Sequence, residues 1–168
     1  MTSARARSFY FLLALLVWAA DQASKWVVAQ ALHVGEVRSL IPGFFNLTHV
    51  TNRGAAFGLF ANVSSPLGTI LLVLFSTLAL AVIGVLLWRN PADRLSGVSL
   101  ALLFGGALGN LLDRVRAGRV VDFLDFHLGG YHWPAFNLAD SAIVVGAALL
   151  LLDLTKTRTP NSFRSGIM

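Results

Sequence analysis

The feature that most constrains this sequence is the segment from Leu67 to Trp88, which contains no charged residue. A helix needs about 20 consecutive apolar residues to cross the hydrocarbon core of a bilayer. Pro66 precedes the segment and Pro91 follows it closely, so a helix boundary is expected near each end. The sequence therefore predicts a transmembrane helix here, and the rest of the chain must fold around a membrane-embedded element.

The composition supports a membrane protein. Apolar residues make up 56% of the chain and charged residues only 12%, against about 25% in a soluble domain, and mean hydropathy is +0.71. Intrinsic disorder is excluded because disordered chains are poor in apolar residues. The absence of cysteine excludes disulfides, thiolate nucleophiles and cysteine-ligated zinc. The net charge of +5 is scattered along an apolar chain, which favours membrane phospholipid over nucleic acid as the partner.

Further apolar segments predict an all-α integral membrane protein with four transmembrane helices in one domain, residues 1–168. The predicted spans are 8–28, 67–88, 95–113 and 137–154. The first span follows Arg5 and Arg7 and resembles a signal peptide, but the three later spans favour an uncleaved helix. The tail, 155–168, shows no periodicity, and we expect it to be disordered.

Four spans place both termini on one side of the membrane. That side carries seven basic residues and the other side six, so the count alone decides little. Most of the six lie beside acids or motif-like polar residues and are expected to serve function rather than topology, so we place the termini in the cytoplasm. The longer connections, 29–65 and 115–137, then lie outside, where function is expected. The β-prone segment 44–52 predicts a small sheet on the outer membrane surface, and such a strand could hold a peptide extended by pairing with it.

Polar residues recur near the outer ends of three spans. An ionisable group within a membrane costs roughly 2.5–3.5 kcal/mol, so its presence suggests a function. The groups that share a helix face are Asp21 with Lys25, Asn110 with Asp113 and Arg114, and Asn137 with Asp140. They predict one polar cluster near the outer interface. A structural ion pair for the first group and an interfacial anchor for Asp113–Arg114 are alternatives that the spacing leaves open.

Asp122 and Asp140 are harder to explain as structural residues. Neither has a basic residue three or four positions away on a predicted helix, and they flank one outer loop. Two carboxylates that lie close together share a proton, because both cannot easily ionise. Such a pair can activate water and protonate a leaving amine, which is peptide hydrolysis without a metal.

Other interpretations of the same residues remain open. Asp122, Asp125, His127 and His132 are residue types that bind metals. In a small proton-coupled transporter, the acids would be relays within the bundle. The glycines of the third span, among them Gly105 and Gly109, are typical of close helix packing.

Four sequence blocks resemble lipoprotein signal peptidase (signal peptidase II), the membrane aspartic protease of bacterial prolipoproteins. The blocks are Asp21-Gln22-Ala23-Ser24-Lys25, Asn52-Arg53-Gly54-Ala55-Ala56-Phe57-Gly58, residues 105–123 with Gly-Asn-Leu-Leu-Asp-Arg and Val-Val-Asp-Phe, and Phe136-Asn137-Leu138-Ala139-Asp140-Ser141. They occur in the order found in that family, and the resemblance covers residues 8–153.

The resemblance implies a four-helix core with a small extracytoplasmic β-cradle and a short periplasmic helix. Asp122 and Asp140 fall on the catalytic pair of the family. The supporting or substrate-binding positions are Asp21, Lys25, Asn52, Gly54, Gly106, Asn110, Arg114, Asn137 and Ala139. No metal or organic cofactor is expected.

The resemblance also implies a substrate and a location. The substrate would be a prolipoprotein that carries diacylglycerol on the lipobox cysteine, and cleavage would occur just before that cysteine. The protein would lie in the bacterial inner membrane with cytoplasmic termini and its active site near the periplasmic face. A cyclic peptide antibiotic such as globomycin would be an inhibitor.

Overall fold

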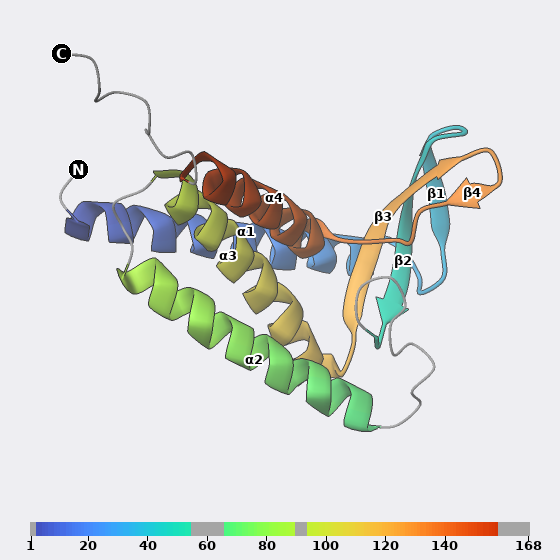
Figure 1. The fold of residues 1–168 in the computed structure, drawn as a ribbon. Coiled ribbons are helices and arrows are strands. Elements are labelled where there is room, and N and C mark those ends of the chain that lie inside the picture. The colour runs from blue at the N-terminus through green and yellow to red at the C-terminus, as the bar shows by residue number, and fades with distance from the viewer. Residues whose placement is uncertain (1–2, 55–65, 90–93, 158–168) are drawn as a thin grey trace, which may run out of the picture.

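The computed structural model describes residues 3–54, 66–89 and 94–157. Four long helices form a bundle, and a small sheet lies at one end of it (Figure 1). The helices are α1 (Ser3–Ala31), α2 (Pro66–Arg89), α3 (Arg94–Ala117) and α4 (Leu138–Thr157). All four are long and apolar enough to cross a membrane, which confirms the four predicted spans. The start of α1 and the end of α4 lie at the end of the bundle opposite the sheet (Figure 1).

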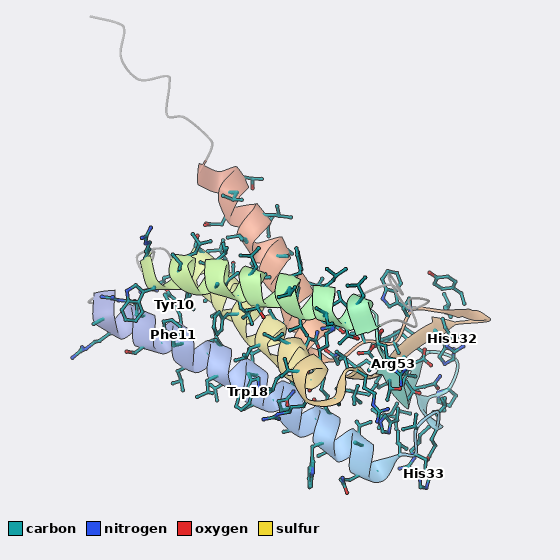
Figure 2. The ribbon with its side chains drawn as sticks, turned by 90° about the horizontal axis from the view of Figure 1, so that it is seen from below. Tyr10, Phe11, Trp18, His33, Arg53 and His132 are labelled. Carbon is teal, nitrogen blue, oxygen red and sulfur yellow. The ribbon has the colours of Figure 1, made fainter. Side chains whose placement is uncertain are left out.

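Large apolar side chains cover much of the outer surface of the bundle. On α2, Phe75 is 72% exposed and Leu78 is 65% exposed. Water would disfavour such a surface, whereas lipid tails solvate it. Inside the bundle, Tyr10, Ala14, Leu87 and other buried side chains pack at the end away from the sheet, where Figure 2 labels Tyr10 and Phe11.

Helix α3 contacts each of the other three helices, and its glycines permit close packing. A Cβ atom at Gly105 would lie 2.5 Å from the backbone oxygen of Ala14 on α1. On α4, Gly146 fits against α3 in the same way, because a Cβ there would lie 2.8 Å from the backbone oxygen of Ser99. The expectation that these small residues serve helix packing is therefore confirmed.

The sheet contains strands β1 (Val37–Ile41), β2 (Phe45–Asn52), β3 (Val120–Leu128) and β4 (Tyr131–His132). They are antiparallel in the order β1-β2-β3-β4. Strand β2 matches the predicted β-prone segment, while β3 and β4 lie in a connection for which we predicted no strand. Gly118, with φ of 67°, turns the chain from α3 into β3, and its N–H donates to the Arg114 carbonyl at 2.9 Å.

Two details differ from the expectations. Residues 45–47 of β2 pair with both β1 and β3, so they offer no free edge to a peptide, and only residues 50–52 pair with β3 alone among the described strands. Helix α4 continues through Thr157, into the expected tail, whose remainder lies outside the described residues. The described residues contain no helix besides α1–α4, so the short periplasmic helix stays a prediction.

The close contact at Gly105 yields a test of the packing. In Gly105→Ala, the new Cβ atom would collide with the backbone oxygen of Ala14 on α1. The backbone of α1 must then shift, because a backbone atom cannot move aside as the end of a flexible side chain can. We expect a loss of about 1–3 kcal/mol in stability, measured as a lower Tm in detergent. Gly130→Ala is the control, since nothing lies within 4 Å of its Cβ position. Equal Tm values for the two variants would contradict the packing.

Candidate active site

Asp122 and Asp140 line one cavity at the sheet end of the bundle. Asp122 lies on β3 and is 3% exposed, and Asp140 lies in the first turn of α4 and is partly buried. The cavity has a volume of about 470 Å³, and its polar lining also includes Asn52, Asn110 and Arg114. Two acids from separate elements thus line the same cavity.

Two asparagine side chains hold Asp122. The Asn52 amide donates to Oδ2 at 3.0 Å, and the Asn137 amide donates to Oδ1 at 2.7 Å. Asn52 is the last residue of β2 and pairs with Val120 of β3, so the β2–β3 register brings it to Asp122. Asn137 precedes α4 and is fully buried. Both carboxylate oxygens of Asp122 therefore accept hydrogen bonds from neutral donors.

The start of α4 and the orientation of Asp140 have a common cause. The Asp140 N–H donates to Asn137 Oδ1 at 2.9 Å, and the Asn137 N–H donates back to Asp140 Oδ2 at 3.4 Å. This reciprocal arrangement is a capping box, with Asn137 as the N-cap of the helix. The Asn110 amide from α3 donates to the other oxygen, Oδ1 of Asp140, at 2.7 Å.

Behind the acids lies a buried charge network around Lys25. The ammonium contacts Asp21 at 2.8 Å and Asp113 at 2.6 Å, and it donates to Asn110 Oδ1 at 3.0 Å. Asp21 also accepts the N–H of Ala139 at 2.9 Å. The network links α1 and α3 to the beginning of α4. The spacing left open an ion pair between Asp21 and Lys25, and the structure contains that pair. Asp113 also pairs with Lys25 and so belongs to the same network.

Helix packing and one arginine complete the arrangement. A Cβ atom at Gly106 would lie 2.5 Å from the backbone oxygen of Ala139, so this glycine lets α3 approach the start of α4. The Arg114 guanidinium donates to the Gly54 carbonyl at 3.1 Å and to the Asn110 carbonyl at 3.2 Å. Arg114 therefore joins the end of β2 to α3, beside the cavity.

The pKa of Asp122 is raised to about 6. Burial is the main cause and the charge of Asp140 adds to it, while the hydrogen bond from Asn52 acts in the opposite direction. Asp125 on the same strand differs. Burial raises the pKa of Asp125, but hydrogen bonds from Asn46 and His132 outweigh that effect and bring the pKa below its ordinary value. Of the two acids on β3, only the one that lines the cavity thus has a raised pKa.

The remaining wall of the cavity is mostly apolar. Ile143, Val144 and Val145 of α4 contribute to it, as do Trp133 and Phe136 from the segment before that helix. Val144 is 65% exposed on the outer surface of the bundle, so the wall continues toward the lipid-facing side of α4. The cavity therefore places polar and acidic groups beside apolar surface.

The predicted site residues converge, although at different depths. Asp122, Asp140, Asn52, Asn110 and Arg114 line the cavity. The others lie behind or beside it through the contacts given above, namely Asp21, Lys25, Gly54, Gly106, Asn137 and Ala139.

Sequence reasoning missed Gln22 and the apolar wall. The Gln22 amide donates to Asp113 at 3.0 Å and to Asp21 at 3.3 Å, so it bridges the two acids that hold Lys25. Its position beside Asp21 in the first motif was the only signal.

Three residues of the metal hypothesis lie together and the fourth lies apart. Asp125 accepts hydrogen bonds from His132 and Asn46, and the His132 ring stacks on His127 with centroids 4.7 Å apart, while Asp122 faces Asn52 and Asn137. The described part of the chain contains no group of three or more His, Asp or Glu side chains that could hold a metal ion.

Comparisons with known proteins show the family of this chain. Residues 13–156 match the family model described as "Signal peptidase (SPase) II". A lipoprotein signal peptidase of Solibacter usitatus is 44% identical over 147 residues, covering 87% of this chain and 90% of that protein. One from Burkholderia mallei is 49% identical over 144 residues, covering 84% of each chain.

The fold also has a solved counterpart. A structure described as a "Bacterial membrane enzyme structure by the in meso method at 2.3 A resolution" matches with a TM-score of 0.82 and 31% identity. The match covers 96% of this chain and 95% of that one. A second structure with the same description, at 1.9 Å, has a TM-score of 0.77 and 33% identity, covering 89% and 94% of the two chains. The chain belongs to the signal peptidase II family.

Proposed function

We propose that this chain is an aspartic endopeptidase that removes the signal peptide from bacterial prolipoproteins. Its substrate carries diacylglycerol on the lipobox cysteine, and the cut falls just before that cysteine. Membership of the signal peptidase II family supports the substrate class. The observation that carries the mechanism is that Asp122 and Asp140 line one cavity while neutral amides hold their oxygens.

In the proposed reaction, Asp122 and Asp140 bind one water molecule and hold one proton between them. The ionised carboxylate takes a proton from the water, whose oxygen attacks the carbonyl carbon of the scissile peptide bond. The neutral carboxyl donates its proton to the carbonyl oxygen. When the tetrahedral intermediate collapses, the C–N bond breaks and the leaving nitrogen receives a proton from the pair. One hydroxyl of the intermediate gives its proton to the ionised carboxylate as the carbonyl re-forms, so the pair again holds one proton. The raised pKa of Asp122 supports a carboxyl that holds a proton near neutral pH.

The remaining site residues position these acids. Asn52 and Asn110 orient Asp122 and Asp140 by hydrogen bonds, and Asn137 bridges the two. Lys25 fixes the amide of Asn110 by donating to its oxygen, so that the NH₂ group faces Asp140. The other supporting residues act through the packing and hydrogen bonds already described, namely Asp21, Gly54, Gly106, Arg114 and Ala139.

The proposed location is the bacterial inner membrane, with cytoplasmic termini and the sheet at the periplasmic face. Lipid-exposed helices and a cavity wall that reaches the outer side of α4 suit a lipid-modified substrate that arrives within the membrane. A peptide that mimics this substrate, such as the cyclic antibiotic globomycin, would occupy the same cavity. A proton-coupled transporter lacks support, because Asp122 and Asp140 gather at one end of the bundle and the family is that of a peptidase.

Replacing either acid tests the mechanism. In Asp122→Asn and Asp140→Asn, the general acid–base pair is incomplete, and we expect cleavage of a lipidated precursor to fall by about 10²–10⁴-fold or more. Asp125→Asn is the matched control, since Asp125 lies on the same strand and contacts Asn46 and His132 instead of the cavity. Tm values verify folding. Near-normal cleavage by either cavity variant would rule out the two-acid mechanism.

Chelation tests the metal alternative. The mechanism proposed for Asp122 and Asp140 needs no metal ion, and in the described part of the chain they do not belong to a group of three or more His, Asp or Glu side chains that could hold one. We expect chelators to leave the cleavage rate unchanged, while a zinc peptidase assayed in parallel loses activity. Strong inhibition that added zinc reverses would support a metal site instead.

Asn52→Ala tests how the amide tunes Asp122. The hydrogen bond from Asn52 favours the charged carboxylate, so its loss raises the pKa of Asp122 further. We expect slower cleavage, weaker positioning of substrate, and a shift of the pH-profile limb that Asp122 controls to higher pH by about one unit. The measurement is kcat and KM across pH. Wild-type kinetics at every pH would make the role of Asn52 purely structural.

A further inference from the structure

Three exposed arginines gather where α3 turns into β3, and the proposed reaction uses none of them. Arg53 and Arg119 lie next to each other, because each directly adjoins the last residue pair between β2 and β3, Asn52–Val120. Arg116 is in the last turn of α3, and the chain reverses at Gly118 before reaching Arg119. Figure 2 shows Arg53 at the sheet end of the bundle.

No acid in the described part of the chain balances these charges. Ion pairs there involve Lys25, Arg38 and His132, and none includes Arg53, Arg116 or Arg119. The acids of the sheet end already have partners of their own. Residues 55–65, which lie outside the described residues, contain no Asp or Glu in their sequence. The cluster therefore carries three uncompensated positive charges.

The length of α3 places the cluster at a definite depth. Its 24 residues span about 36 Å, against about 30 Å for the hydrocarbon core of a bilayer. The last turn, with Arg116, therefore reaches the lipid headgroups. Exposed aromatic residues of the kind found at membrane interfaces, Tyr131 and Trp133, belong to the same end of the molecule.

We propose that Arg53, Arg116 and Arg119 bind the phosphate of an anionic phospholipid headgroup. Guanidinium groups match phosphate oxygens with paired N–H donors, and several on adjacent turns can share one phosphate. Lys and Arg are less frequent in extracytoplasmic loops than in cytoplasmic ones, so three exposed arginines without an acidic partner are unusual on that side. The proposal rests on the proposed function in one respect: the orientation of the protein in the membrane decides which leaflet supplies the lipid.

The bound lipid would lie beside the cavity. Asn52 and Val120 line the cavity, and they are the chain neighbours of Arg53 and Arg119. A headgroup held there brings its acyl chains next to the route of a diacylglyceryl substrate. An acidic segment of the substrate is a less suitable ligand than a lipid. The part of the substrate that follows the cysteine extends away from the membrane, whereas the end of α3 lies at the level of the lipid headgroups.

The test uses the full-length protein in vesicles of phosphatidylcholine, with and without phosphatidylglycerol. The readout is binding of spin-labelled phosphatidylglycerol relative to spin-labelled phosphatidylcholine. We expect Arg→Gln changes at the three positions to lower this preference about fivefold for each arginine removed. The triple Arg→Lys variant should retain most of it. Arg38→Gln is the control, because Arg38 is an exposed arginine of the same sheet that pairs with Glu36 at 3.6 Å.

Three results would overturn the proposal. The first is an unchanged lipid preference in the triple Arg→Gln variant, or in the three single variants if the triple variant does not fold. The second is displacement of the labelled lipid by inorganic phosphate but not by chloride at equal ionic strength, which would indicate a site for free phosphate. The third is normal lipid binding with selective loss of cleavage for precursors that have acidic residues after the cysteine. Since lipid binding is measured without cleavage, a failure of the proposed peptidase activity would be seen separately.

Discussion

The site depends on holding two carboxylates out of water with neutral donors. A buried carboxylate without hydrogen bonds costs several kcal/mol, while a cation in direct contact would fix it in the charged form. Asp122 and Asp140 avoid both conditions, because amide N–H groups from Asn52, Asn110 and Asn137 satisfy their oxygens. The amides stabilise the acids and still allow one proton to be held between them.

Two cations lie near these acids, and no ion pair in the described residues joins either of them to Asp122 or Asp140. Arg114 donates to the Gly54 and Asn110 carbonyls, whereas Lys25 is buried between Asp21 and Asp113 and donates to the side-chain oxygen of Asn110. That contact fixes which end of the Asn110 amide faces Asp140. It requires α1, α3 and α4 to approach closely, and the glycines of α3 allow this. Helix packing, the charge network and the orientation of the acids are therefore parts of one arrangement.

Local sequence patterns predicted the elements whose causes are local. The uncharged segment of α2 required a membrane span, and the Asn137–Asp140 spacing predicted that both residues share a face at the start of the last span, although the capping box that they form was not predicted. The family resemblance identified which polar residues to expect in one site. Strand β3 was missed because its polar residues interrupt the apolar pattern and its partner, β2, lies far away in the sequence.

Other features also needed three-dimensional information. Pairing of residues 45–47 on both edges depends on β1 and β3, so the β-prone pattern alone suggested a free strand. Gln22 acts between two acids that meet only when α1 packs on α3. The arginine cluster likewise forms only through the turn at Gly118 and the β2–β3 register.

Infrared titration of the folded protein tests the central claim most directly, because a protonated carboxyl has its own C=O stretching band. The account predicts a carboxyl proton that is retained well above the ordinary range of aspartate, with a pKa of about 6, and whose band disappears in Asp122→Asn. A protein whose aspartates are all ionised by pH 5, or a band that is unchanged in that variant, would contradict a proton held between the two acids.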